Sequence, residues 1–412
     1  MSQIKKKKDC RLCGSKKIRN IFNLCNSPLA NNLSININTS LKTKKYPLNL
    51  MICKNCKHVQ LGHVVNEKKL YKNYFYMTGI SKQFRDHFKN YADSTLKLFN
   101  ANSNLKILEI GSNDCTLLDN FKKKRFTTVG IEPATNLWRL TKNRHKIING
   151  FYDKKTNIKL LKKYKSFDII LANNVFAHID NIKQIFLLLK KLMHDKSIII
   201  FEVSYLLDVI KKKLFDTIYH EHLDYHSIEP LVSFFKKIDL KIIDLKKIST
   251  HGGSIRVYIA KNSTVRLAKT KKIYTFIKNE KKNGVNKEST IVKMFNKLEV
   301  EKFKLENFFQ KIKGNVVYGY GAPAKAVTLI NYFNLNEENI NLIIDDSKLK
   351  QNKYIPGSKI IITNSRILYS KPPKYIIILA WNIYKDILAK LKNFKNIGYI
   401  VIPLPKFRLI KL

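Results

Sequence analysis

The chain has 412 residues, of which 44% are hydrophobic and 26% charged, and a formal net charge of +48. This length favours two or three domains, and the hydrophobic content excludes a disordered protein. Residues 1–9 are rich in lysine and lack the apolar core of a secretory signal, and no apolar run approaches the length of a membrane span, so we expect a cytoplasmic protein.

The charge excess has two explanations. The 78 Lys and Arg residues against 30 Asp and Glu residues would suit a nucleic acid or another anionic partner. The lysines are spread along the chain rather than gathered in one stripe, and Ile and Asn are abundant as well, as expected of an AT-rich coding sequence. We favour compositional drift, because a nucleic-acid site would concentrate the charge on one face.

The first motif along the chain is a pair of Cys-x-x-Cys turns. Four thiolates in two such turns predict a closed, tetrahedral, structural zinc site, with unmetallated redox pairs as the alternative. The predicted ligands are Cys10, Cys13, Cys53 and Cys56. His58 and His63 lie nearby but are not needed to complete the site, and Cys25 is expected to be a free thiol.

An aromatic-rich connector spans residues 71–81 and follows a zinc module expected at residues 1–70. Aromatic residues at this density usually pack in a core. The alternative is a lid over a ligand, with tyrosine hydroxyls as its polar contacts.

Residues 81–262 alternate short apolar runs with helical stretches, the first of which is an amphipathic helix predicted over residues 81–99. This alternation predicts a doubly wound α/β sheet. The predicted strands are 106–110, 128–131, 146–148, 167–172, 197–203, 241–245 and 255–260. The two closely spaced strands at the end predict a seven-stranded sheet with an antiparallel hairpin at one edge.

Polar residues follow the first, second and fourth of these strands, where such sheets bind ligands. The candidate cofactor-binding residues are Glu109, Gly111, Asn113, Asp114, Glu132 and Asn174. Glu132 lies about twenty positions beyond Gly111, a spacing suited to ribose hydroxyls. The glycine loop lacks the further glycines that admit a pyrophosphate, which indicates a nucleoside-like cofactor without phosphates; a plain strand-to-helix turn is the alternative.

The run Tyr219-His220-Glu221-His222 places a phenol, two imidazoles and a carboxylate in four consecutive positions. Its spacing is not that of His-Glu-x-x-His, which argues against a metalloprotease site. Histidine titrates near neutral pH, and an adjacent Glu or Tyr can orient its ring. We interpret the run as the proton-transfer part of an active site, with loop packing as the alternative.

Residues 263–412 form the last part of the chain. Its Lys- and Glu-rich beginning predicts a connecting helix pair up to residue 313, followed by a strand, a Gly319-Tyr320-Gly321 loop and a helix. Further apolar runs at 341–344, 359–362, 375–380 and 399–402 predict a second α/β sheet. A Gly-x-Gly at a helix N-terminus favours anions, although the domain could be purely structural.

Together these motifs resemble class I S-adenosylmethionine (SAM)-dependent methyltransferases, and more closely the NDP-sugar C-methyltransferases with an N-terminal zinc-binding domain. The resemblance rests on residues 108–114, 130–133 and 174–178 and on the Tyr-His-Glu-His run, and it covers nearly the whole chain. It implies a Rossmann-like seven-stranded core at residues 71–262, between the zinc module and a second Rossmann-like domain at residues 263–412. SAM would bind at the glycine loop, with Glu132 on its ribose.

Members of that family methylate the carbon beside the 4-keto group of a nucleotide-bound deoxysugar: a base removes the α-proton, and the enolate carbon attacks the sulfonium methyl. The catalytic residues implied by this analogy are His222, Tyr219, Glu221, His178 and Tyr76. His222 would be the base, with Tyr219 and Glu221 positioning the sugar or the imidazole. His178 would contact the keto sugar or the enolate oxygen, and Tyr74 competes with Tyr76 for the position above the methyl group.

The resemblance also implies that the C-terminal domain binds the NDP-sugar. The candidate substrate-binding residues are Lys325, Gly321, Asp345, Trp381 and Asn382. We expect a monomer that acts on a small molecule and has neither a membrane nor a nucleic acid as partner. The rival hypotheses are O- or N-methylation of another acceptor, a basic zinc-containing RNA-binding protein or RNA methyltransferase, and a non-catalytic cofactor-binding protein, since Cys115 stands where the family usually has glycine.

Overall fold

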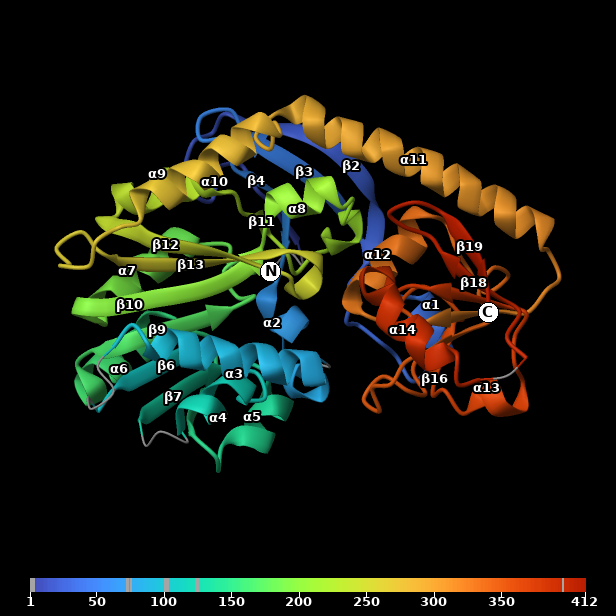
Figure 1. The fold of residues 1–412 in the computed structure, drawn as a ribbon, viewed down its shortest axis with the longest axis horizontal. Coiled ribbons are helices and arrows are strands. Elements are labelled where there is room, and N and C mark those ends of the chain that lie inside the picture. The colour runs from blue at the N-terminus through green and yellow to red at the C-terminus, as the bar shows by residue number, and fades with distance from the viewer. Residues whose placement is uncertain (1–3, 72–73, 75, 100–103, 123–125, 395) are drawn as a thin grey trace.

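The computed structural model describes residues 4–71, 74, 76–99, 104–122, 126–394 and 396–412. Figure 1 shows two lobes, each built around one large sheet, with the long helix α11 (Glu288–Lys311) running from the middle of the molecule along the top of the right lobe. Within the described residues, no helix combines the length and the apolar character that a membrane crossing requires.

The left lobe in Figure 1 contains a seven-stranded sheet with the order β12-β13-β10-β9-β6-β7-β8. Its strands are β6 (Lys106–Ile110), β7 (Thr127–Glu132), β8 (Lys146–Asn149), β9 (Phe167–Asn173), β10 (Met193–Ser204), β12 (Leu240–Ile248) and β13 (Ser254–Lys261). Strands β6 to β10 are parallel, and β13 is antiparallel to both β10 and β12. The predicted sheet and its antiparallel edge hairpin are therefore confirmed.

Helices cover both faces of this sheet, as expected of a doubly wound fold. They are α3 (Lys82–Leu96), α4 (Thr116–Lys122), α5 (Thr135–Thr141), α6 (Lys154–Tyr164), α7 (Ile182–Lys191), α8 (Leu206–Lys211) and α9 (Ile228–Lys237). Strand β6 is buried from Ile107 to Ile110 because both of its faces are covered, and Ile107 and Leu108 have no exposed surface. Strand β10 begins four residues before the predicted strand, and a register shift separates the added residues from the rest.

The right lobe contains a six-stranded sheet with the order β16-β15-β14-β17-β18-β19. Its strands are β14 (Val317–Tyr320), β15 (Leu342–Ile344), β16 (Ile361–Thr363), β17 (Tyr375–Ile378), β18 (Tyr399–Ile402) and β19 (Arg408–Lys411). All are parallel except the edge strand β19, which was not predicted. The helices of this part are α11, α12 (Ala324–Tyr332), α13 (Ile367–Ser370) and α14 (Tyr384–Leu391), whereas α10 (Thr270–Lys282) contacts α9 and β12 of the left lobe.

The N-terminal part forms a small antiparallel sheet that sequence patterns did not predict. Strands β2 (Ile18–Pro28), β3 (Lys45–Cys53) and β4 (Val59–Leu61) pair in turn. The strand β11 (Asp224–Tyr225), which follows the Tyr-His-Glu-His run in the sequence, pairs with β4. The smaller elements of this part are β1 (Ile4–Lys6), β5 (His63–Val65), α1 (Ile37–Leu41) and α2 (Glu67–Tyr71). This module touches both lobes, because β2 contacts α11 and α12 of the right lobe while β4 pairs with β11.

Candidate active site and zinc centre

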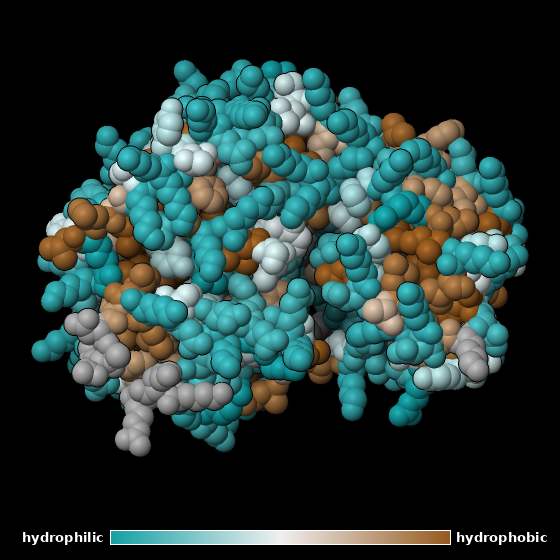
Figure 2. All heavy atoms as spheres, in the orientation of Figure 1, coloured by the Kyte–Doolittle hydropathy of each residue, from teal (hydrophilic) through white to brown (hydrophobic). Residues whose placement is uncertain are grey.

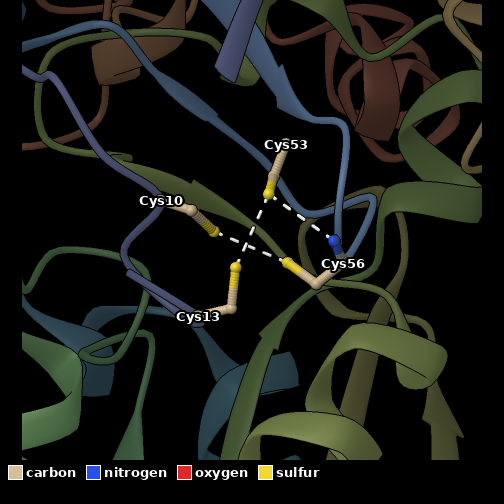
Figure 3. A group of neighbouring side chains, drawn as sticks. All are labelled: Cys10, Cys13, Cys53 and Cys56. Carbon is tan, nitrogen blue, oxygen red and sulfur yellow. Dashed lines mark hydrogen bonds between the residues drawn. The ribbon is translucent and has the colours of Figure 1, made fainter. Parts of the chain in front are cut away.

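Four cysteine side chains meet between the two N-terminal turns (Figure 3), and their sulfur atoms all lie within 4.8 Å of one another. The Sγ atoms of Cys10 and Cys56 are 3.5 Å apart, and those of Cys13 and Cys53 are 3.6 Å apart. A tetrahedral zinc site with Zn–S bonds of about 2.3 Å places its sulfurs about 3.8 Å apart, so the four cysteines fit zinc. His58 is directed elsewhere: its Nε2 lies 2.6 Å from Asp224 Oδ1.

A cavity of about 860 Å³ lies between the two lobes. Figure 2 shows a hollow between the lobes on the face in view. The carboxyl ends of β6, β7 and β9 line one side of the cavity, and the loop from β14 to α12 lines the other. Of the predicted catalytic, cofactor-binding and substrate-binding residues, all but Glu221 and Trp381 are among the described residues that line the cavity.

The glycine turn after β6 has no room for a side chain. Gly111 has a φ of +67°, and a Cβ atom at this position would lie 2.5 Å from Val175 Cγ2. Behind the turn, Glu109 Oε2 and Asn173 Oδ1 are buried and have no hydrogen-bond partner within the described part of the chain. Two buried acceptors without partners suit the ammonium group of an amino acid, which requires hydrogen-bond acceptors.

Glu132 bonds to the backbone of the glycine loop. Its Oε2 accepts from the N–H of Asn113 at 2.7 Å, and its Oε1 accepts from the N–H of Ala134 at 2.8 Å. Burial raises the pKa of Glu132 to about 7. Each carboxylate oxygen retains a second lone pair, so Glu132 can also accept from ribose hydroxyls.

Asn113 and Asp114 attach the connector to the same loop. Asn113 Oδ1 accepts from the N–H of Thr78 at 3.1 Å, and its Nδ2 donates to the carbonyl of Tyr76 at 3.0 Å. Asp114 Oδ2 accepts from the N–H of Gly79 at 2.6 Å. The connector therefore lies along the cofactor loop, and its 3-10 turn η1 (Thr78–Ile80) is held by side chains of that loop.

Two tyrosines of the connector bond to predicted catalytic residues. Tyr71 OH lies 2.9 Å from Nδ1 of His178, and Tyr74 OH donates to Glu221 Oε2 at 3.2 Å. Both tyrosines line the cavity, which fits the lid alternative better than simple core packing. The connector residues that lie outside the described part are 72, 73 and 75.

His222 and Tyr219 form a hydrogen-bonded pair at the centre of the cavity. His222 Nδ1 lies 2.8 Å from the carbonyl of Thr217, and its Nε2 lies 2.9 Å from Tyr219 OH. A carbonyl can only accept, so Nδ1 carries the proton and Nε2 keeps the lone pair. Burial lowers the pKa of His222 to about 4, and burial also raises the pKa of Tyr219. At neutral pH the pair is a neutral imidazole that accepts from a protonated phenol.

Glu221 does not itself line the cavity, but its carboxylate bonds to two residues that do, Tyr74 and Asn31. Its Oε1 accepts from Asn31 Nδ2 of the N-terminal module at 2.6 Å. Burial raises the pKa of Glu221 to about 7. Together with Tyr74, this carboxyl joins the N-terminal module, the connector and the Tyr-His-Glu-His run. Asn31 has no sequence motif around it, so this contact could be found only in the folded chain.

Two further imidazoles flank the pair. The ring centroids of His178 and His222 are 5.0 Å apart, and the buried Nε2 of His178 has no partner among the described residues. His251 lies in the turn η3 (Thr250–Gly252), with Nε2 3.3 Å from Nδ2 of Asn174. Burial lowers the pKa of His251 to about 4. In the sequence, His251 is followed by Gly252 and Gly253, which are typical of a turn.

The right lobe contributes a buried cation to the cavity. Lys325 Nζ donates to Asn382 Oδ1 at 2.5 Å, and both side chains line the cavity. Trp381 is only 3% exposed and donates from Nε1 to Asp216 Oδ2 at 2.7 Å, away from the cavity. This tryptophan therefore supports Lys325 from behind rather than facing the space that a ligand would occupy.

The loop after β14 is shaped by a close backbone approach. Gly321 has a φ of +86°, and a Cβ atom there would lie 2.7 Å from the Cβ of Ala380. Asp345, at the end of β15, accepts from the N–H of Ala322 at 2.7 Å and pairs with Lys350 at 3.6 Å. An acidic residue at this strand end and a glycine turn beside it repeat the arrangement of Glu132 and Gly111 in the other lobe.

Three family models match the chain one after another. The model described as "Putative zinc binding domain" matches residues 10–71, "Methyltransferase domain" matches 84–245, and "C-methyltransferase C-terminal domain" matches 249–405. The C-methyltransferase NovU of Streptomyces niveus is 26% identical over 409 residues, which cover 98% of this chain and 96% of that protein. Together these matches identify the protein as a C-methyltransferase.

Solved methyltransferase structures match part of this C-methyltransferase. A SAM-dependent methyltransferase from Clostridium acetobutylicum is 14% identical, covering 43% of this chain and 92% of its own, with a TM-score of 0.35. The magnesium protoporphyrin IX methyltransferase ChlM from Synechocystis PCC 6803, with bound SAM, is 10% identical, covering 43% of this chain and 78% of its own, with a TM-score of 0.32.

The enzyme is thus a SAM-dependent methyltransferase with a four-cysteine site that fits zinc. The residues at the glycine turn fit SAM, because the cofactor's ammonium group requires the acceptors that Glu109 and Asn173 leave without partners. When it is bound, SAM supplies the electrophilic methyl group, and the protein supplies the geometry and the proton transfer.

Proposed function

We propose that this C-methyltransferase methylates an NDP-4-keto-deoxysugar at the carbon beside the keto group. The observation that carries the proposal is the His222–Tyr219 pair, whose fixed tautomer leaves a basic nitrogen in the cavity between the cofactor loop and Lys325. Carbon methylation beside the carbonyl of a keto sugar requires such a base, whereas O- or N-methylation of a group that is already nucleophilic does not.

In this proposal His222 Nε2 takes the α-proton, and the C–H electron pair moves into the enolate. Tyr219 remains protonated because burial raises its pKa, so its hydroxyl can turn from Nε2 to the enolate oxygen and donate to it. His178 Nε2, which is buried without a partner in the described residues, lies beside the pair and can bond to the sugar. The chain thereby holds the enolate carbon against the cofactor side of the cavity.

The nucleotide half of the substrate would lie against the right lobe. Lys325 offers a cation to a phosphate, and Asn382 holds its Nζ in place. Gly321 lets a ligand approach the backbone, and the carboxylate of Asp345 suits the hydroxyls of a ribose. Glu132 and Tyr76 belong to the cofactor side in this arrangement, and Trp381 acts only through Lys325.

The proposal is tested by solvent deuterium exchange at the α-carbon of an NDP-4-keto-6-deoxyhexose, followed by mass spectrometry with and without SAM. We expect exchange with the wild type, and a rate about 10²- to 10⁴-fold lower for His222→Gln, the range for loss of a general base. The matched control is His220→Gln, since His220 belongs to the same run but is buried outside the cavity, with its Nε2 3.2 Å from the carbonyl of Tyr46. Its exchange rate should stay within a few-fold of the wild type.

Two results would contradict the proposal. Exchange that survives in His222→Gln would remove His222 as the base. Absence of exchange by the folded, zinc-loaded wild type across a panel of such sugars would indicate another acceptor.

A further inference from the structure

A short segment before the Tyr-His-Glu-His run is held by the right lobe. This segment contains the 3-10 turn η2 (Phe215–Thr217) and Ile218. The ring of Phe215 stacks on Phe333 at a centroid distance of 5.7 Å, and the carbonyl of Ile218 accepts from Thr328 Oγ1 at 3.2 Å. Thr328 lies on α12, the helix that also carries Lys325.

Asp216 is the polar centre of this contact. It has no exposed surface, and its Oδ2 accepts from Trp381 Nε1 at 2.7 Å and lies 3.8 Å from Lys325 Nζ. Desolvation lowers the pKa of Lys325, and the carboxylate of Asp216 opposes this shift. Lys325 lines the cavity and Asp216 does not, so the carboxylate acts from behind the lysine.

The same segment sets the tautomer of His222. Thr217 follows Asp216 directly, and its carbonyl oxygen accepts a hydrogen bond from Nδ1–H of His222, with 2.8 Å between oxygen and nitrogen. Displacement of this carbonyl would release Nδ1, and the proton could then move to Nε2, where it blocks the base. Asp216 is therefore adjacent in sequence to Thr217, whose carbonyl oxygen keeps the His222 proton on Nδ1 and leaves Nε2 unprotonated.

We propose that Asp216 is a positioning residue that couples the anionic end of the substrate, held at Lys325, to the placement of His222. The inference rests on the proposed function, because it assigns the substrate an anionic group and His222 the role of base. Asp216 touches neither the anionic group of the substrate nor His222. It aims Lys325 into the cavity and fixes the backbone that orients the imidazole, so the charge on the substrate contributes to kcat as well as to binding.

The first test is Asp216→Asn in the full-length enzyme. Asparagine can still accept from Trp381, so the shape of the contact survives, but Lys325 loses its counter-charge and becomes neutral at lower pH. We expect KM for the NDP-sugar to rise by about tenfold or more between about pH 6 and about pH 9 in the variant, and by less than about threefold in the wild type. Among the other titratable groups, His251 interacts electrostatically with Lys325, and Asp345, Asp346, Lys350, Asp386 and Lys390 line the same cavity. They are present in both proteins, and the difference between the two profiles isolates Asp216.

The second test is Asp216→Ala, which removes the acceptor for Trp381. We expect kcat to fall by about tenfold or more, with the nitrogen NMR signals of isotope-labelled His222 changing from the Nδ1–H tautomer to a mixture, because a misplaced orienting group misplaces the base. Asp239→Asn is the matched control, since Asp239 is an exposed aspartate that pairs with Lys190 at 2.7 Å. It should change neither kcat nor the histidine signals.

The outcomes separate this inference from the proposed function. If the wild type methylates an NDP-keto-sugar but Asp216→Asn and Asp216→Ala keep its KM profile, kcat and His222 tautomer, the inference is wrong and the function stands. Binding of inorganic pyrophosphate, measured by calorimetry, needs no turnover. The inference is supported if the affinity for pyrophosphate falls more steeply with rising pH in Asp216→Asn than in the wild type and in Asp239→Asn. An equal pH dependence in all three proteins overturns it.

Discussion

Cys115 has a left-handed backbone, with a φ of +63°, and a side chain with no exposed surface. The backbone explains why glycine suits this position, since a residue with a Cβ is strained there by about 1 kcal/mol. The buried thiol offsets this strain by filling the core beside α4, and burial raises its pKa to about 12, which keeps it unreactive. The backbone strain at Cys115 and the burial of its thiol thus act in opposite directions on the free energy of unfolding, and the glycine turn at Gly111 is kept.

Two substitutions at this residue separate strain from packing. Cys115→Gly removes the strain and the buried thiol together, so we expect the free energy of unfolding to stay within about 1 kcal/mol of the wild type. Cys115→Ala keeps the strain and loses the sulfur, and should be less stable by about 1 kcal/mol. Urea unfolding measures both. A glycine variant less stable than the alanine variant would show that the left-handed backbone carries no cost here.

Sequence patterns located most of the cavity residues but not the direction in which each side chain points. His220 and His222 flank the same residue, Glu221, yet only His222 lines the cavity. Trp381 and Glu221 turn away to partners distant in the chain, which no local pattern could indicate. The choice of His222 came from family resemblance, and it remains a prediction.

At the scale of elements, the two parallel sheets were predicted because their strands are short apolar runs separated by helical stretches. The N-terminal sheet was missed for physical reasons. Strand β2 is polar at alternate and adjacent positions and has two register shifts against β3. Strand β11 has only two residues and is defined by its pairing with β4 rather than by its composition.

Loss of the zinc centre should affect both the stability of the N-terminal module and the distant cavity. Substitution Cys53→Ser removes one of the four thiolates, so we expect zinc content and the unfolding midpoint to fall together, since a structural zinc site contributes directly to folding. Cys25→Ser is the matched control, because Cys25 lies in β2 outside the four-cysteine group.

Zinc content of the purified proteins, measured by atomic absorption, decides between the ligand set and a chance cluster. Unchanged zinc in Cys53→Ser, or loss of zinc in Cys25→Ser, would contradict the assignment. Asn31 of the same module bonds to Glu221, so we also expect release of zinc to disturb the cavity although no cysteine lines it.

At the scale of the whole molecule, buried neutral histidines make stability depend on pH. Burial lowers the pKa of four of them to about 4, namely His220, His222, His226 and His251. The unfolded chain, with histidine pKa values of about 6.5, binds more protons below that pH. The stabilisation is therefore complete above about pH 6.5 and is lost as the pH falls towards about 4.

His220→Gln tests this expectation, since glutamine can replace the bond to Tyr46 but does not titrate. Between about pH 7 and about pH 5, we expect the wild type to lose about 2 kcal/mol more unfolding free energy than the variant, from the displaced pKa of this one histidine. Urea titrations at both pH values give the comparison. Equal losses in the two proteins would mean that His220 is not held neutral by the fold.

The pairing of β4 with β11 has a consequence for synthesis on the ribosome. The strands β2, β3 and β4 are made early, but the strand that completes their sheet is Asp224–Tyr225, and the helices that β2 touches, α11 and α12, are made later still. Because a sheet edge cannot close before its partner strand exists, the first part of the chain to emerge must wait until more than half of the chain, up to Tyr225, has been made. The four cysteines are complete once Cys56 has been made, so we expect the zinc site to be the part of this module that can form during that interval.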